Sequence, residues 1–279
     1  MSTTEYRDLL DTAVAAARAA VDVHRRHLGR VRVEDWSEKG VADFVTHVDR
    51  EAEERILALV NGRFPEHAVL AEEGATAVAA APAGSPAAAA PAEAEWLWIV
   101  DPLDGTTNFL HGYPMYSVSV AVLHRGAPVA GAVVSGATGE EWTAMRGGGA
   151  FRDGRRIRVS DIERLKLALI GTGFPFKTVH ELPRYLRHLD GVLRNTAGVR
   201  RGGSAALDLC HLASGHLDGF WELSLAPWDI AAGVLVVQEA GGIVTAVDGG
   251  PVDLRAGGSV LAGNPRIHAA LRTLLASLD

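Results

Sequence analysis

Hydrophobic residues recur at helical spacing near the start of the chain and predict a helix over residues 4–28. Five apolar residues share one side of this helix: Leu9, Leu10, Val14, Ala17 and Val21. Gly29 follows, and glycine is favoured just beyond a helix end because it adopts a positive φ without strain. A second amphipathic helix is predicted over residues 49–64, with acidic side chains in its first turn, where they complement the helix dipole. The run that follows, at 67–74, predicts a short strand that leads into acidic residues.

The middle of the chain changes to the pattern of β-strands. Strands are predicted at residues 95–101, 116–126 and 128–135 and within 140–159. The second and third of these form a hairpin that turns at Arg125-Gly126. Further along, strands at 167–174, 218–223 and 259–264 alternate with helices at 180–195, 203–214, 228–240 and from Pro265 onward. The pattern predicts an α+β subdomain, residues 1–155, followed by an α/β subdomain, residues 156–279.

Composition narrows the classes of protein to consider. The chain has 279 residues, and 27 basic against 34 acidic residues give a net charge of −7, which offers no basic surface for nucleic acid. The single cysteine, Cys210, excludes an intramolecular disulfide and fits a small buried residue of a helix. No signal peptide and no apolar run long enough to span a membrane is found, so we expect a cytoplasmic protein. Residues 75–95 are rich in Ala and Pro, and we interpret them as a surface insertion without chemistry.

The hexapeptide DPLDGT places Asp101 and Asp104 directly after an apolar strand. By itself it is typical of a surface type I turn, with Pro in the second position. Its position favours a functional site, because sites in α/β structures form where strands end. Glu72 and Glu73 end the preceding predicted strand, and Asp229 lies in the first turn of an apolar helix, where Asp is also favoured as helix-start chemistry. Clustered carboxylates without a Cys cluster or a His pattern indicate a hard cation, Mg²⁺ before Zn²⁺.

Two longer stretches carry a family resemblance. WIVDPLDGTTNFLHGYP, residues 98–114, and PWDIAAGVLVVQEAGG, residues 227–242, resemble the inositol monophosphatase family of Mg²⁺-dependent, lithium-sensitive sugar-phosphate phosphatases. The resemblance runs from about Lys39 to the C-terminal helix, interrupted mainly by the Ala/Pro insertion. It implies a layered αβαβα sandwich of the inositol monophosphatase/fructose-1,6-bisphosphatase type.

The same resemblance assigns metal ligands and catalytic residues, most of them in the first subdomain. The implied metal ligands are Glu72, Asp101, the backbone carbonyl of Leu103, Asp104 and Asp229. Thr106 matches the threonine that helps to orient the attacking water, together with Glu72. Asp49 matches the acid that supports this threonine and an outer metal. The residues agree with this assignment, since Asp101 and Asp104 flank a predicted turn and can converge with an intervening carbonyl on one point.

Substrate contacts are also implied. Gly105 and Thr106 are expected to meet the phosphate through backbone N–H groups at a helix start, and the resemblance places Gly203, Ser204 and Ala205 in the sugar pocket and Glu222 on a hydroxyl. Other interpretations remain open from the residues alone. Ser204 is an equally good helix N-cap, and Glu222 an ordinary strand-end residue. Arg200 and Arg201 fit a loop, or contact an anionic substrate or a subunit partner.

The implied function is hydrolysis of a small polyol phosphate monoester by metal-activated water, with Mg²⁺ as cofactor, in a homodimer inhibited by Li⁺. Inositol 1-phosphate is the favoured substrate, because DGTTNFLHGYP and GGSAALD are intact and the short chain shows no extra pocket for an adenine. Fructose 1,6-bisphosphate, histidinol phosphate, NADP and 3′-phosphoadenosine 5′-phosphate are the alternatives within this chemistry. A regulatory or scaffold protein with this fold is a further alternative, although no implied metal ligand is missing.

Overall fold

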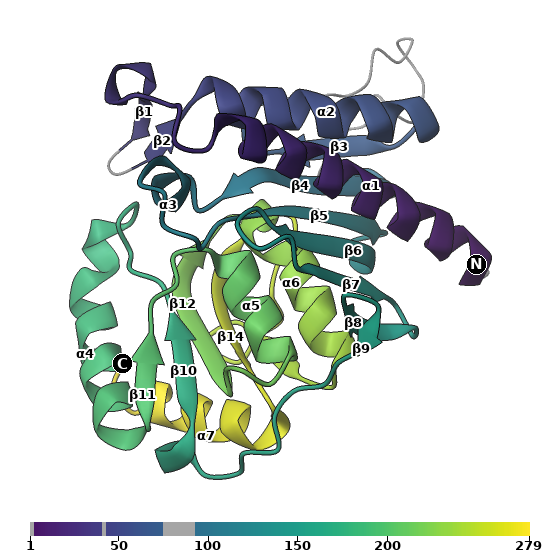
Figure 1. Cartoon of the computed structure of the whole chain (residues 1–279). Coiled ribbons are helices and arrows are strands. Elements are labelled where there is room, and N and C mark those ends of the chain that lie inside the picture. The colour runs from purple at the N-terminus through teal and green to yellow at the C-terminus, as the bar shows by residue number, and fades with distance from the viewer. Residues whose placement is uncertain (1–2, 41–42, 75–92) are drawn as a thin grey trace.

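The computed structural model describes residues 3–40, 43–74 and 93–279, so most of the predicted Ala/Pro insertion lies outside the described residues. Within these ranges the helices and strands stack in alternating layers (Figure 1). Two long helices, α1 (Thr3–His27) and α2 (His47–Arg63), cover the outer face of a seven-stranded sheet. Both helices agree with their predicted ranges to within two residues, and the side chain of Thr46 caps the start of α2.

The seven-stranded sheet has the order β3-β4-β5-β6-β7-β8-β9. Its strands are β3 (Ala68–Ala71), β4 (Trp96–Asp104), β5 (Ser117–His124), β6 (Ala127–Ser135), β7 (Glu141–Met145), β8 (Gly149–Arg152) and β9 (Arg155–Arg156). Side chains of β4 alternate between its faces. Trp98 and Val100 belong to the core formed with α1 and α2, whereas Leu97 and Ile99 belong to the core on the opposite face. Because both faces are buried, the sequence of β4 is a continuous apolar run.

Helices α5 (Ala205–Ala213) and α6 (Pro227–Glu239) form a middle layer between the two large sheets. The helices approach closely at Gly233, where an added Cβ would lie 2.7 Å from Cδ1 of Leu209. Helix α6 is buried along most of its length and packs against the seven-stranded sheet, which explains why it lacks a polar face. The middle layer therefore joins the two halves of the chain.

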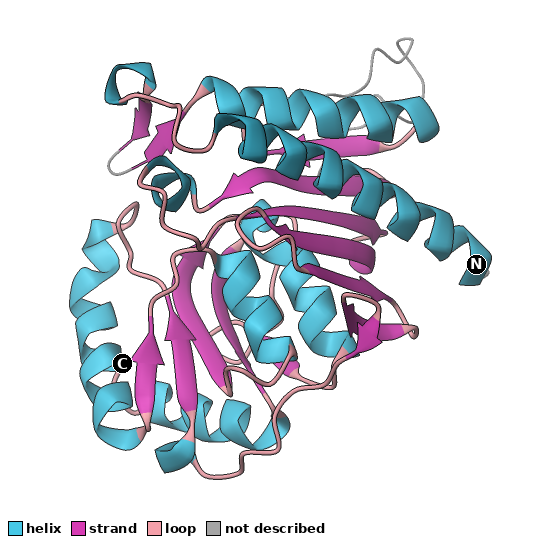
Figure 2. Cartoon of the chain, in the orientation of Figure 1, coloured by secondary structure: helices cyan, strands magenta, loops and turns pink. Residues whose placement is uncertain are grey.

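The second large sheet has five strands in the order β11-β10-β12-β14-β13. Figure 2 draws the strands of both large sheets in magenta. Its strands are β10 (Leu169–Thr172), β11 (Gly198–Arg200), β12 (Gly219–Leu225), β13 (Ile243–Thr245) and β14 (Gly258–Gly263). Strand β10 pairs in parallel with β11 and β12, and β14 runs antiparallel to its two neighbours. Helices α4 (Leu182–Asn195) and α7 (Pro265–Ala276) pack on its outer face. The predicted αβαβα layering is confirmed.

The end of β4 differs from its prediction. The apolar run predicts a strand that stops at residue 101 and enters a turn, whereas β4 continues to Asp104. Its register against β5 shifts between Asp101 and Asp104, which is the mark of a β-bulge. Pro102 lies inside this irregular segment, and a proline cannot donate a ladder hydrogen bond. A bulge that presents two aspartates thus replaces the predicted turn.

Several short elements have no counterpart among the predictions. They are β1 (Ser37–Gly40), β2 (Asp43–Val45), β11 and β13, together with short 3₁₀ turns. Each spans four residues or fewer, which is too short for a periodic pattern to identify. None of the described helices has the length and hydropathy needed to cross a membrane.

Candidate active site

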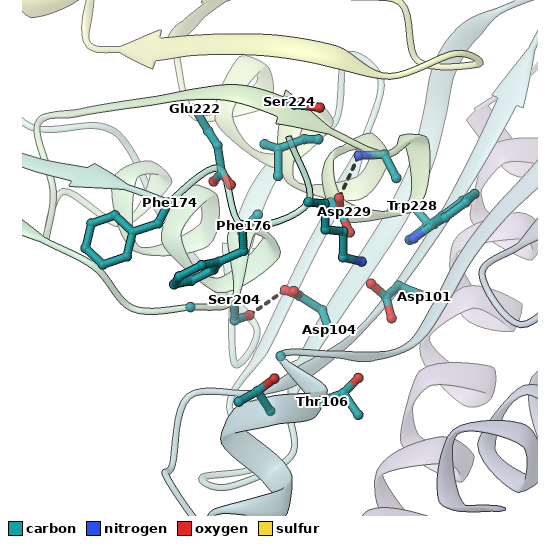
Figure 3. A pocket seen from close by; sticks show the side chains of 18 of the residues that line it. Asp101, Asp104, Thr106, Phe174, Phe176, Ser204, Glu222, Ser224, Trp228 and Asp229 are labelled. Carbon is teal, nitrogen blue, oxygen red and sulfur yellow. Dashed lines mark hydrogen bonds between the residues drawn. The ribbon is translucent and has the colours of Figure 1, made fainter. Parts of the chain in front are cut away.

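A cavity of about 620 Å³ lies where the bulged end of β4 meets the starts of three helices, α3 (Thr106–Leu110), α5 and α6. Figure 3 shows side chains from both halves of the chain pointing into it. The segment after β10, residues 173–178, forms another part of its wall. The predicted site residues near β4, α5 and α6 therefore surround one space.

Three aspartates converge in this cavity. Asp101 and Asp104 come from β4 and Asp229 from the first turn of α6, and one carboxylate oxygen of each lies within 4.8 Å of the others. Asp101 and Asp104 are buried and Asp229 is half-buried. Carboxylate oxygens at this spacing are suited to hold a divalent cation.

Asp104 is held from the second half of the chain. Its Oδ2 accepts hydrogen bonds from Oγ of Ser204 at 2.5 Å and from the backbone N–H of Ala206 at 2.9 Å. Oγ of Ser117, on β5, lies 3.4 Å from the same oxygen. The carboxylate thus satisfies donors at the start of α5 and joins this helix to the end of β4.

The other two aspartates are fixed by their own backbone neighbours. Oδ1 of Asp101 accepts the N–H of Leu103 at 2.9 Å, within the bulge. Oδ2 of Asp229 accepts the N–H of Ala226 at 2.7 Å, so this side chain caps the start of α6 as well as facing the other acids. The helix-start interpretation of Asp229 and its place in the cluster are therefore both correct.

Burial and mutual repulsion raise the pKa of all three carboxyl groups. Burial, then the charges of Glu72, Asp104 and Asp229, raise the pKa of Asp101 well above its usual value. Burial raises the pKa of Asp104 to about 6, and burial with the charge of Asp104 raises the pKa of Asp229 to about 8. Like charges crowded in a dry site favour protonation, and a bound cation removes that cost. This donor set fits a hard divalent metal ion.

Glu72 and Lys177 add opposite charges to the same cavity. Glu72 follows β3 and lines the cavity, but its carboxylate is not one of the three that lie within 4.8 Å of each other. Lys177 lines it from the segment after β10, and its positive charge lowers the pKa of Asp229. No sequence pattern indicated Lys177, because the stretch GFPFK continues a predicted strand and has no ligand spacing.

Thr106 and Asp49 are in contact, as the resemblance implies. Oγ1 of Thr106 lies 3.2 Å from Oδ1 of Asp49 and 3.0 Å from the carbonyl oxygen of Leu103. A hydroxyl has a single proton, so the two acceptors share or alternate for it. Oδ2 of the fully buried Asp49 accepts the N–H and the hydroxyl of Thr46, each at 2.8 Å. These bonds fix the carboxylate that orients Thr106.

Gly105 precedes α3 with a φ of +89°, in the left-handed region. An added Cβ would lie 2.8 Å from the carbonyl oxygen of Met115 and 3.2 Å from that of Gly203. Both the conformation and the space require glycine here. The predicted helix start is present, and Gly105 and Thr106 line the cavity.

The predicted sugar-pocket residues also line the cavity. Gly203 has a φ of +91°, and Ala205 is 9% exposed at the start of α5. Ser204 is buried, and its Oγ accepts the N–H of Leu207 in addition to bonding Asp104, so its hydroxyl is an N-cap engaged with other groups. Glu222, on β12, lines the cavity, and burial, followed by the charges of Asp229 and Asp208, raises its pKa well above the usual value.

Comparison with known proteins places the chain in a family. The chain belongs to the inositol monophosphatase family, whose profile matches residues 5–278. Nus factor SuhB of Pseudomonas aeruginosa is 42% identical over 269 residues, 96% of this chain and 95% of that protein. The inositol-1-monophosphatase of Rhizobium meliloti is 43% identical over 267 residues, 96% of each chain. The crystal structure of the extragenic suppressor protein suhB of Bartonella henselae matches with a TM-score of 0.85 at 39% identity, covering 96% of this chain and 98% of that one.

Family membership supports phosphatase activity and a metal requirement, and the aspartate cluster fits a metal. The names of these two relatives differ, one an inositol-1-monophosphatase and one a Nus factor, so the similarity alone does not identify the substrate.

Proposed function

We propose that this protein is a Mg²⁺-dependent phosphatase that hydrolyses a small polyol phosphate monoester, with inositol 1-phosphate as its substrate. The observation that carries the proposal is the convergence of Asp101, Asp104 and Asp229 in a cavity that also holds Thr106 and Glu222. Oxygen donors favour Mg²⁺ over softer metals. Asp101, Asp104, Asp229, Glu72 and the Leu103 carbonyl are the proposed ligands. Bound there, Mg²⁺ supplies positive charge to the phosphate and lowers the pKa of water.

The protein's own groups orient the reactants. Thr106, held by Asp49, and Glu72 are proposed to orient a water molecule for in-line attack on phosphorus. A bond from the water oxygen to phosphorus forms as the bond to the alcohol oxygen breaks, and the leaving alcohol takes up a proton. The N–H groups of Gly105 and Thr106 are proposed to bind the phosphate, because they stand beside the aspartates.

The alcohol half of the substrate is proposed to lie against Gly203, Ser204, Ala205 and Glu222. The Ser204 side chain is engaged with Asp104, so its contribution to the wall comes from its backbone and position. Glu222 is an acceptor suited to a substrate hydroxyl. A six-membered polyol phosphate fits within a cavity of about 620 Å³.

Phosphate release from a panel of esters tests the proposal. The panel holds inositol 1-phosphate, fructose 1,6-bisphosphate, histidinol phosphate, NADP and 3′-phosphoadenosine 5′-phosphate, each with Mg²⁺, with EDTA, and with Mg²⁺ plus Li⁺. The expected result is Mg²⁺-dependent, Li⁺-sensitive release that is fastest from inositol 1-phosphate. A higher kcat/KM for another ester would support the proposed phosphatase activity but show that inositol 1-phosphate is not the preferred substrate. No release from any ester would reject the phosphatase.

A regulatory role is a second candidate function, because several relatives bear the name Nus factor SuhB. It predicts that a variant without turnover still restores growth to a strain that lacks this protein.

We also propose that residues 1–155 and 156–279 act as two subdomains and that the protein is a homodimer. Sedimentation velocity would test the proposed homodimer.

A further inference from the structure

Arg201 lies at the mouth of the cavity against two adjoining aromatic rings. Its guanidinium carbon lies 5.2 Å from the ring centroid of Phe174 and 5.3 Å from that of Phe176. All three residues line the cavity that contains the aspartate cluster. Cation–π contacts on two rings restrict a side chain that is otherwise long and mobile. The guanidinium is therefore positioned before any ligand arrives.

The hydrogen-bonding capacity of this group is unused. An arginine side chain has five N–H donors and no acceptor. Within residues 3–40, 43–74 and 93–279, Arg201 makes no hydrogen bond and no ion pair. Its Nη1 lies over Gly203, where an added Cβ would be only 2.2 Å away. Because Gly203 has no side chain, the guanidinium of Arg201 can occupy the space beside the start of α5.

Glu222 presents acceptors on another wall of the same space. Its carboxylate lies over Gly173, where an added Cβ would be 2.2 Å from both Oε1 and Oε2. Figure 3 shows Glu222 pointing into the cavity, on the side where Phe174 and Phe176 lie. The charge of Arg201 lowers the pKa of Glu222 against the larger effect of burial, although the two groups form no ion pair. Donors and acceptors thus face the cavity without being paired to each other.

We propose that Arg201 is a substrate-binding residue that, together with Glu222, selects phosphate esters with neighbouring hydroxyl groups. A hydroxyl matches this pair because its O–H donates to Glu222 while its oxygen accepts from Arg201. An ester without hydroxyl groups leaves the donors of Arg201 and the acceptors of Glu222 without partners. The pair therefore favours esters of a hydroxylated alcohol over esters of an alcohol without further hydroxyl groups. This inference rests on the proposed phosphatase activity and specifies its substrate.

The test compares three esters, inositol 1-phosphate, p-nitrophenyl phosphate and fructose 1,6-bisphosphate, in one variant. Arg201→Met keeps an unbranched side chain against the two rings and removes every donor of the guanidinium. We expect its KM for inositol 1-phosphate to rise about tenfold, the equivalent of one hydrogen bond to a charged group, with kcat within about twofold of wild type. Its KM for p-nitrophenyl phosphate, which has no hydroxyl, stays unchanged. Arg200→Met is the matched control, because Arg200 donates to the carbonyl of Val199 and does not line the cavity.

Two results would overturn the inference and leave the phosphatase standing. An equal rise in KM for inositol 1-phosphate and for p-nitrophenyl phosphate would mean that Arg201 supports the structure of the site only. A larger rise for fructose 1,6-bisphosphate than for inositol 1-phosphate would mean that Arg201 binds a second anion. If the wild-type protein released phosphate from none of the three esters, the proposed function and this inference would both be rejected.

Discussion

Nε2 of His24 lies 2.9 Å from the carbonyl oxygen of Pro102, so helix α1 holds the bulge that carries Asp101 and Asp104. His24 is fully buried and packs against Phe109. Burial lowers the pKa of His24 to about 4, so the ring is neutral near pH 7 and Nε2 is the donor. A carbonyl that loses its place in the sheet ladder at the bulge thereby gains a partner from outside the sheet.

This contact predicts a metal-binding effect from a residue outside the cavity. His24→Leu removes the donor and leaves the buried Pro102 carbonyl without a partner, at a cost of about 1–3 kcal/mol. We expect the Mg²⁺ concentration for half-maximal activity to rise several-fold. His24→Gln offers an amide donor and is expected to stay near wild type. Mg²⁺ titrations of activity, with the Tm of each variant in EDTA, check this, and equal Mg²⁺ affinities in the two variants would contradict it.

Removal of one cluster charge is expected to separate activity from stability. Asp101→Asn should abolish Mg²⁺-dependent phosphate release, because one proposed ligand loses its charge. Without metal its Tm should equal or exceed that of wild type, because repulsion from Glu72, Asp104 and Asp229 is relieved. Asp161→Asn is the control, since that side chain is 88% exposed. Near-full activity of Asp101→Asn would show that the metal assignment is wrong.

The raised pKa values predict how stability depends on pH in the absence of metal. The folded-state pKa of Asp104 is about 6 and that of Asp229 about 8, both above the ordinary value of 3.8. These two groups bind more protons in the folded protein than in the unfolded chain up to about pH 8, which makes stability fall as pH rises. The buried His24, His67 and His211, whose pKa is lowered from 6.5 to about 4, have the opposite effect below pH 6.5. Above pH 6.5 only the carboxyl effect remains, so urea midpoints in EDTA should decrease from pH 6.5 to pH 8. Mg²⁺ should reverse the trend, and a flat profile in EDTA would contradict the crowding of charges.

Gly105 offers a test of the backbone that positions Thr106. Gly105→Ala places a Cβ 2.8 Å from the carbonyl of Met115 at a φ of +89°. The left-handed conformation alone costs about 1–2 kcal/mol, so we expect a lower free energy of unfolding and a lower kcat. Gly62→Ala is the matched control, because nothing lies within 4 Å of its added Cβ and it sits in α2. That variant should gain up to about 1 kcal/mol. Denaturant titration of both variants measures the difference.

The long helices and strands were predictable because each buries one face, whose apolar residues recur at a regular spacing in the sequence. Helix α1 and the β5–β6 hairpin follow their hydrophobic patterns, and the hairpin turns at Arg125 (φ 51°) and Gly126 (φ 80°) as predicted. Three-residue strands such as β13 exist only because β14 pairs with them, which no local pattern records. The bulge in β4 likewise depends on pairing with β5.

The site also has a part that the sequence predicts and a part that depends on long-range contacts. Asp101, Asp104 and Asp229 were identified by motifs in which the residues themselves carry the chemistry. Lys177 and the stacking of Arg201 on two phenylalanines depend on how the segment after β10 folds back over the cavity. Sequence spacing does not encode that path. Contacts between distant segments are therefore the part of the site that required the structure.

The hydrogen bonds from Ser204 and Ala206 to Asp104 couple the geometry of the aspartate cluster to the packing of the helices around it. Asp104, at the end of β4, is hydrogen-bonded to the start of α5, and Asp229 lies on α6. The three aspartates therefore come together only when β4, α5 and α6 are packed correctly against one another. The affinity for a cation then depends on how well these three elements pack together. Loosening the fit of α5 against α6, for example at Gly233, will weaken cation binding from a distance while every ligand remains in the sequence.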